Sequence, residues 1–181
     1  MNYTESLAYL DSLGKFGIKL GMERIEGLLR ELGNPEQKIK TVHVTGTNGK
    51  GSVTSMITNI LLAANLKVGK FTSPHLVKYN ERINLNGKDI SDEDFATAIT
   101  AVKVAADSVV KKGVCEQPTQ FEILTAAAFL YFYLQKVDYA VIEVGMGGLW
   151  DSTNVITPVV SVITNVCLLY TSPSPRDPKT S

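Results

Sequence analysis

The chain has 181 residues, of which 44% are hydrophobic, so it can bury a core without a disulfide framework. Lys plus Arg and Asp plus Glu each number 18, and this zero net charge removes the electrostatic basis for a nucleic-acid or anionic-membrane surface. Two cysteines and no apolar N-terminal run predict a cytoplasmic protein without a signal peptide. No apolar stretch reaches the roughly 20 residues of a membrane span.

The first part of the chain is expected to contain two helices, a strand and a third helix. Apolar residues at helical spacing predict helices over residues 4–13 and 22–32. The β-branched segment 40–45 leads directly into glycines, which is typical of a strand that ends in a turn. From Lys50 the helical period returns, and one face of this helix is expected to carry Val53, Ile57, Ile60, Leu61 and Ala64.

The rest of the chain predicts four strands and two helices. In order, they are strands 68–72 and 83–85, the latter before an Asn86-Gly87 turn, helices 91–112 and 119–135 with N-cap signatures, and strands 137–144 and 158–166. The last two strands are apolar on consecutive residues, as in strands covered on both faces. This alternation predicts a single α/β domain with a mostly parallel sheet flanked by helices.

The C-terminal segment differs in composition from the rest. Three of the seven prolines fall within its last nine residues, together with several Ser and Thr residues. We expect residues 167–181 to form a disordered, non-native tail and residues 1–166 to carry the fold.

A glycine-rich segment with a lysine and a serine lies between the strand at 40–45 and the helix after it: Gly46-Thr47-Asn48-Gly49-Lys50-Gly51-Ser52. Glycines bring backbone N–H groups close to an oxyanion, and the helix dipole adds positive potential, so this arrangement suits the phosphates of ATP. The strict phosphate-loop pattern fails, because Val44 replaces its first Gly and Gly51 follows the lysine. The alternative is a glycine-rich turn with a solvated lysine.

The apolar strand at 137–144 contains a carboxylate, Glu143, which is followed by more glycines. Ligands of doubly wound sheets bind at the carboxyl ends of the strands, so Glu143 is expected to face the phosphates, where it suits Mg²⁺. Alternatively, Glu143 caps a neighbouring N–H group. Asp151 and Asn154 follow on the same loop, and the Thr153-Asn154 pair is equally explained by ordinary turn chemistry.

A third polar segment follows the strand at 68–72 and contains Ser73, His75, Glu81 and Arg82. By itself it predicts a surface loop with a hydrogen-bonded His75 and an exposed Glu81–Arg82 pair.

Together these motifs resemble the folylpolyglutamate synthase and dihydrofolate synthase family, a branch of the Mur-type ATP-dependent ligases. The resemblance rests on GTNGKGS at 46–52, TSPHL at 72–76 with NERI at 80–83, and EVGMGG followed by DSTN at 151–154. It covers residues 1–166 in order. It implies the N-terminal part of a Mur-ligase ATP-binding domain that lacks the C-terminal glutamate-ligase domain, so that the chain alone is expected to be inactive.

The resemblance implies that a carboxylate of folate or dihydropteroate attacks the γ-phosphate of ATP, giving an acyl phosphate and ADP, after which the amine of L-glutamate displaces phosphate. ATP and Mg²⁺ are the implied cofactors, and the full-length parent is expected to be a monomer. The implied phosphate-binding residues are Gly46, Thr47, Asn48, Gly49, Lys50, Gly51 and Ser52. The implied catalytic residues are Lys50 and Glu143, and the metal ligands Ser52, Ser73 and Glu143. The implied substrate-binding residues are Ser73, Pro74, His75, Leu76 and Arg82.

Two departures from the family pattern stand out. Leu149-Trp150 occupies the place of a frequent arginine, and Cys167-Leu168-Leu169 replaces an Asp-His pair whose histidine helps to hold magnesium. Two alternatives remain open at this point. One is another Mur-type ligase that acts on a UDP-muramoyl substrate. The other is a non-catalytic nucleotide-binding module, although no guanine-reading N-K-x-D motif is present.

Overall fold

The computed structural model describes residues 1–14, 21–146 and 148–166, and its centre is a six-stranded sheet. The strands are β1 (Thr41–Thr45), β2 (Val68–Phe71), β3 (Ile83–Leu85), β4 (Lys88–Asp89), β5 (Tyr139–Glu143) and β6 (Val160–Ile163). They lie in the order β4-β3-β2-β5-β1-β6, with β2, β5, β1 and β6 parallel and the β3 and β4 hairpin antiparallel. The prediction of a mostly parallel sheet is confirmed.

Each predicted helix is present in the described part of the chain. The α-helices are α1 (Tyr3–Leu13), α2 (Glu23–Glu31), α3 (Lys50–Ala63), α4 (Asp92–Lys111) and α5 (Gln120–Leu134). Short 3₁₀ turns are η2 (Pro35–Lys38), η3 (Tyr79–Arg82) and η4 (Ser152–Val155). No helix within the described residues is long and apolar enough to cross a bilayer.

Local signals explain where several elements begin and turn. Thr119 and Glu122 form the reciprocal capping box that opens α5, and Ser91 accepts a hydrogen bond from the N–H of Asp94 at the start of α4. Asn86 and Gly87 have φ values of 50° and 81°, as a two-residue hairpin turn between β3 and β4 requires. These boundaries follow from contacts within a few residues.

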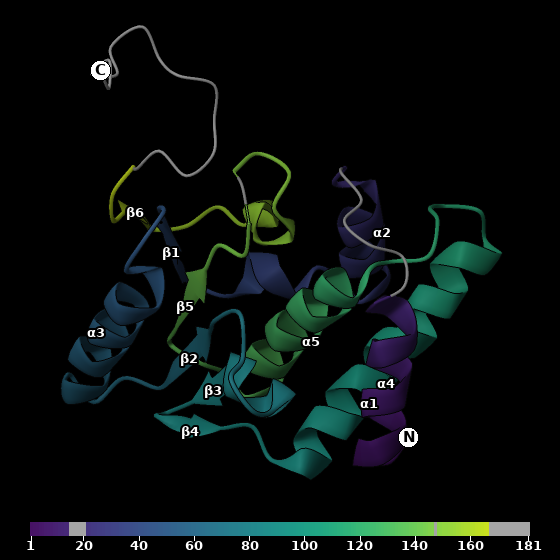
Figure 1. Cartoon of the computed structure of the whole chain (residues 1–181), viewed down its shortest axis with the longest axis horizontal. Coiled ribbons are helices and arrows are strands. Elements are labelled where there is room, and N and C mark those ends of the chain that lie inside the picture. The colour runs from purple at the N-terminus through teal and green to yellow at the C-terminus, as the bar shows by residue number, and fades with distance from the viewer. Residues whose placement is uncertain (15–20, 147, 167–181) are drawn as a thin grey trace, which may run out of the picture.

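Helices cover the two faces of the sheet unequally (Figure 1). On one face, α3 packs over four valines of the sheet: Val42, Val44, Val68 and Val141. On the other face, a larger core joins the sheet to α1, α2, α4 and α5, and it includes the fully buried Phe71, Phe129 and Phe132. The carboxyl ends of β2, β5 and β1 therefore lie side by side between the two helical layers.

Two expectations about burial are wrong. On α3, Val53, Ile57 and Leu61 pack inward, but Ile60 is 68% exposed and Ala64 is also exposed, because the buried face is centred on Thr54 and Thr58. Strand β6 was expected to be covered on both faces, yet its residues are largely exposed because it lies at the edge of the described sheet, beside β1. By contrast, β5 is buried from Ala140 to Glu143, as expected. The expected tail at 167–181 lies outside the described residues.

Candidate functional site

The loop between β1 and α3 brings the N-terminus of α3 to the end of the sheet. Gly46 has a φ of 134° and Gly49, the N-cap of α3, has a φ of 78°, conformations that L side chains rarely adopt. No side chain caps the helix at Gly49, so the N–H groups of its first turn, including that of the exposed Ser52, remain available to an anion. The predicted glycine-rich loop at the start of a helix is confirmed.

The ammonium group of Lys50 lies back over this loop. Its Nζ donates to the carbonyl oxygens of Gly46 at 3.0 Å and Thr47 at 3.4 Å, and the side chain is half-buried. The alternative of a merely solvated lysine therefore does not describe this structure. The positive charge is held next to the N–H groups that begin α3.

Two residues that follow β6 brace the same loop. The Thr164 hydroxyl donates to the carbonyl of Asn48 at 2.7 Å, and the N–H of Asn48 donates to Oδ1 of Asn165 at 3.0 Å. The N–H of Thr47 donates to the Asn165 carbonyl at 3.1 Å. A side chain at Gly46 would collide with Thr164. This brace is not predictable from local sequence, in which it leaves no signal beyond a Thr-Asn pair at the end of a predicted strand.

Glu143 lies at the carboxyl end of β5 and faces the start of α3. It is 5% exposed, and a Cβ added to Gly51 would lie 3.8 Å from each of its carboxylate oxygens. The N–H of Ser73, in the loop after β2, donates to its Oε2 at 3.2 Å. The adjacency of β2, β5 and β1 thus brings together three residues from the three predicted motifs.

The electrostatic environment of Glu143 combines burial with nearby positive charge. Burial raises the pKa of its carboxyl, and the hydrogen bond from Ser73 and the charges of Lys50 and Lys70 oppose that rise. Within the described residues, no group of three or more His, Cys, Asp or Glu side chains is placed to hold a metal ion. Any divalent cation here would therefore depend on one carboxylate together with hydroxyl, phosphate or water oxygens.

Asp151 organises the loop that follows β5. Its carboxylate accepts hydrogen bonds from the N–H of Met146 at 2.7 Å, the N–H of Thr153 at 3.0 Å and the Thr153 hydroxyl. Oγ1 of Thr153 lies 2.8 Å from Nε2 of His43 on β1, and because the hydroxyl proton goes to Asp151, His43 acts as the donor. Burial lowers the pKa of His43, which favours the neutral ring. Hydrogen bonds within this turn thus account for Asp151 and Thr153. The side-chain amide of Asn154 donates to the carbonyl of Leu149.

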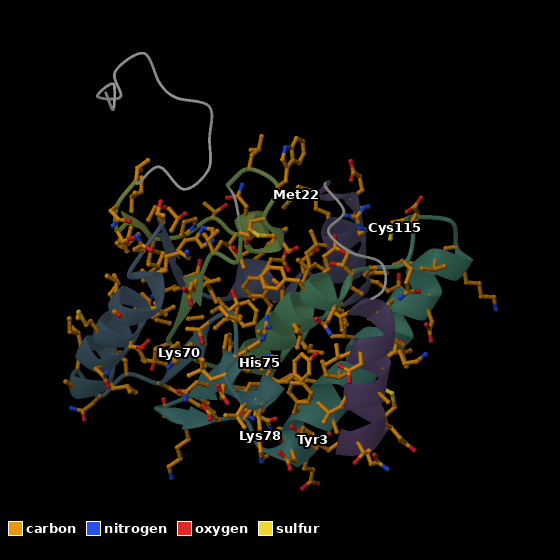
Figure 2. All side chains as sticks on the ribbon, viewed as in Figure 1. Tyr3, Met22, Lys70, His75, Lys78 and Cys115 are labelled. Carbon is orange, nitrogen blue, oxygen red and sulfur yellow. The ribbon has the colours of Figure 1, made fainter. Side chains whose placement is uncertain are left out.

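The segment 72–82 forms a braced loop, which can be followed in Figure 2 from the labelled His75 and Lys78. The Glu81 carboxylate accepts hydrogen bonds from the N–H groups of residues 76, 77 and 78 at 2.7–2.9 Å. Nε of Arg82 donates to Nδ1 of His75 at 2.8 Å, and the rings of His75 and Tyr79 are 4.4 Å apart. The predicted Glu81–Arg82 pair is therefore wrong, because each side chain has a different partner, whereas the hydrogen-bonded His75 is confirmed.

The predicted substrate residues do not all meet the phosphate loop. Ser73 contacts Glu143, but His75 and Arg82 bond to each other beside Tyr79, whose hydroxyl donates to Asp11 on α1. Pro74 is exposed, and Leu76 at the tip of the loop is 92% exposed. Burial, followed by the charge of Arg82, lowers the pKa of His75. The loop therefore presents an exposed apolar pair, Leu76 and Val77, three to four residues after Ser73.

Comparison with known proteins agrees with this arrangement. Residues 44–167 match the family described as Mur ligase middle domain. The chain belongs to the Mur ligase family. The match begins in β1 and includes the loop before α3, Ser73 and Glu143. The polar residues at the carboxyl ends of β1, β2 and β5 therefore all lie within the matched part of this Mur ligase domain.

The named relatives indicate which kind of Mur-type ligase the chain is similar to. The chain is 45% identical to the dihydrofolate synthase/folylpolyglutamate synthase of Bacillus subtilis over 91% of this chain and 38% of the relative. It is 46% identical to the folylpolyglutamate synthase of Lacticaseibacillus casei over 93% of this chain and 39% of the relative. A solved FPGS–AMPPCP–folate complex superposes with a TM-score of 0.87 at 45% identity and covers 94% of this chain and 42% of that chain. The chain thus spans about two fifths of the length of these relatives.

Proposed function

We propose that residues 1–166 are the N-terminal part of the ATP-binding domain of a ligase that joins L-glutamate to folate, to dihydropteroate, or to both. The observation that carries this proposal is the meeting of the glycine-rich start of α3 with Glu143 and Ser73 at one edge of the sheet. The relatives' names support the substrate class. Because the chain spans 38–39% of those relatives, ligation is proposed for the whole protein.

In the proposed reaction, a substrate carboxylate oxygen attacks the γ-phosphorus of ATP and ADP leaves. The glutamate amine then attacks the acyl carbon, loses a proton and expels inorganic phosphate, so that an amide forms. The glycine-rich loop at residues 46–52 holds the phosphate oxygens, chiefly through the N–H groups of the first turn of α3, because the N–H groups of Thr47 and Asn48 already donate to Asn165. Lys50 neutralises charge at the β- and γ-phosphates. Such phosphoryl transfer depends mainly on positioning and charge neutralisation, which these groups supply.

The donor set fits a magnesium ion. Glu143 offers a buried carboxylate at the end of β5, and Ser52 and Ser73 offer hydroxyl oxygens on the two neighbouring segments. Mg²⁺ bound there would neutralise phosphate charge during the transfer. Glu143 would hold it directly or through water, and Ser52 and Ser73 would complete the oxygen ligands.

The loop that carries Pro74, His75, Leu76 and Arg82 is proposed to contact the pteridine-containing substrate. Its support is the exposed apolar tip at Leu76, which the three N–H bonds to Glu81 hold in place beside Ser73. We also propose that the parent is a cytoplasmic monomer, and the use of ATP fits the cytoplasm.

Calorimetric titration of the chain tests these assignments in two steps. AMPPCP with Mg²⁺ is expected to bind saturably, and binding without Mg²⁺ is expected to be weaker. Dihydropteroate or folate added to the nucleotide complex is then expected to bind, whereas a UDP-muramoyl peptide is not. Binding of the muramoyl ligand alone would overturn the folate assignment, and absence of AMPPCP binding would overturn the phosphate site.

A further inference from the structure

Lys70 on β2 is a charged residue beside the candidate site that the proposed reaction does not use. Strand β2 buries Val68, Gly69 and Phe71, whereas Lys70 is half-buried. Side chains alternate between the two faces of a strand, so Lys70 shares the face of Val68, which packs in the cluster under α3. Figure 2 labels Lys70 between α3 and β2. This lysine therefore lies on the face of the sheet that α3 covers.

Strand register brings Lys70 close to Glu143. Lys70 is the partner of Val141 on β5, and Glu143 lies two residues further along the same strand, on the same face. Such diagonal neighbours are within reach of long side chains. Burial raises the pKa of Glu143, and the charges of Lys50 and Lys70 are among the effects that oppose the rise. Two cations therefore act on this carboxylate before any metal ion or nucleotide binds.

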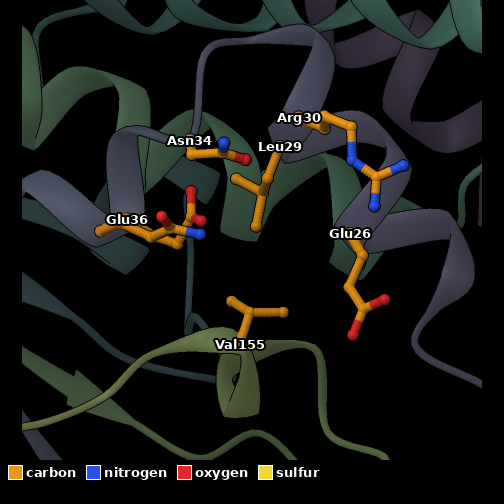
Figure 3. Close-up of a pocket in the computed structure, with 7 residues that line it drawn as sticks. Glu26, Leu29, Arg30, Asn34, Glu36 and Val155 are labelled. Carbon is orange, nitrogen blue, oxygen red and sulfur yellow. The ribbon is translucent and has the colours of Figure 1, made fainter.

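Among the described residues, the hairpin on the other side of Lys70 gives its ammonium group no hydrogen bond. Lys70 pairs with Asn84 on β3, and the Asn84 amide donates to Asp89 on β4 at 3.1 Å. Oδ1 of the buried Asn84 has no hydrogen-bond partner, so Lys70 does not donate to it. No ion pair joins Lys70 to a carboxylate in the described part of the chain. Arg30, which lines the hollow shown in Figure 3, belongs to the helical layer on the opposite side of the sheet.

Lys50, Lys70 and Glu143 together carry a net charge of +1 when all three are ionised. This balance attracts a triphosphate and opposes a divalent cation that arrives alone. We propose that Lys70 restrains Mg²⁺ binding at Glu143, so that the ion binds together with the triphosphate rather than before it. This inference rests on the proposed ATP-dependent function. Lys70 acts through Glu143 and is a positioning residue.

Mn²⁺ binding to the nucleotide-free chain, measured from the EPR signal of the free ion, tests this role directly. Lys70→Met keeps the aliphatic stem, and it is expected to tighten Mn²⁺ binding by about three- to tenfold, because a unit charge no longer repels the divalent ion. Lys70→Arg should bind Mn²⁺ as the parent chain does. Lys88→Met, at an exposed position on β4, is the matched control. Unchanged or weaker binding by Lys70→Met would overturn the inference, and so would tightening that persists when Glu143→Gln is added.

Calorimetry with AMPPCP separates the effect of charge from damage to the fold. Lys70→Met is expected to weaken AMPPCP binding without Mg²⁺ by about threefold or more, because a cation beside the phosphate site is lost. The Mg²⁺ concentration for half-maximal binding should instead fall, whereas damage to the fold would raise it. Absence of AMPPCP binding by the parent chain would overturn the proposed function. Binding with an unchanged Mg²⁺ requirement in Lys70→Met would overturn the inference about Lys70 alone.

Discussion

The backbone N–H of Ser73 donates a hydrogen bond to Oε2 of Glu143 at 3.2 Å and so joins the loop after β2 to the end of β5. The same carboxylate faces Gly51 at the start of α3. One buried negative charge therefore lies at the junction of three segments.

Replacing Glu143 by Gln keeps an acceptor for the N–H of Ser73 but removes the charge. We expect the Mg²⁺ concentration for half-maximal AMPPCP binding to rise by about tenfold or more, as is common when a metal site loses a supporting group. The fold should persist, because the change removes a buried charge. A Mg²⁺ titration that coincides with that of the parent chain would show that Glu143 has only a structural role.

Lys50→Ala removes the ammonium group above the loop. Hydrogen bonds to charged groups contribute about 1.5–3 kcal/mol, so AMPPCP affinity is expected to fall by at least about tenfold. Calorimetry measures the affinity, and thermal unfolding checks that the melting temperature is retained. Lys111→Ala, at an exposed position in the last turn of α4, serves as the control. Equal affinities for the two variants would refute the phosphate-loop assignment.

Gly46→Ala places a side chain where φ is 134° and where Thr164 already lies. We expect a loss of about 1–3 kcal/mol in the free energy of unfolding, which is typical of strained backbone, together with weaker AMPPCP binding. Gly14→Ala is the matched control, because φ is −57° and a Cβ there meets no atom within 4 Å. That change should instead stabilise the chain by about 0.4–1 kcal/mol. Urea unfolding measures both, and similar effects of the two variants would contradict the steric argument.

Thr164→Val removes the hydroxyl that donates to the carbonyl of Asn48. A single hydrogen bond contributes about 0.5–1.5 kcal/mol, so AMPPCP affinity should decrease by about two- to tenfold as the loop loses its brace. Thr164→Ser retains the hydroxyl and should bind as the parent chain does. If the Val and Ser variants bind equally well, Thr164 does not position the loop.

Glu36 predicts a pH-dependent effect on stability. Burial raises its pKa in the folded state above its ordinary value of 4.5, so the folded state binds the proton more tightly than the unfolded chain does. Its favourable contribution is fully present below pH 4.5 and is lost as the pH rises through the folded-state pKa. Glu36→Gln is therefore expected to raise the melting temperature relative to the parent chain more at pH 7.5 than at pH 4.5. An equal difference at both pH values, measured by calorimetry, would contradict the raised pKa.

Sequence-based prediction succeeded where the signals are local. The glycines before Lys50 lie within one turn of the helix they introduce, and the capping box at Thr119 and Glu122 spans three residues. The placement of Glu143 was also predictable, because the carboxyl ends of parallel strands meet at one edge of a sheet. Prediction failed where burial or partner choice depends on distant elements. The exposure of β6 follows from its edge position, and the backbone contacts of Glu81 follow from the path of its loop.

The sequence by itself determined the kinds and order of the elements, the glycine-rich loop and the family of ligases that the chain resembles. These follow from residue types and spacings that act over a few positions. Only the tertiary structure decided that Asn165 and Thr164 brace the loop at Asn48, that Thr153 links Asp151 to His43, and that Oε2 of Glu36 is buried without a hydrogen-bond partner. The contacts with Asn48 and His43 join residues 110–117 positions apart, and strand order, rather than any local pattern, brings them together.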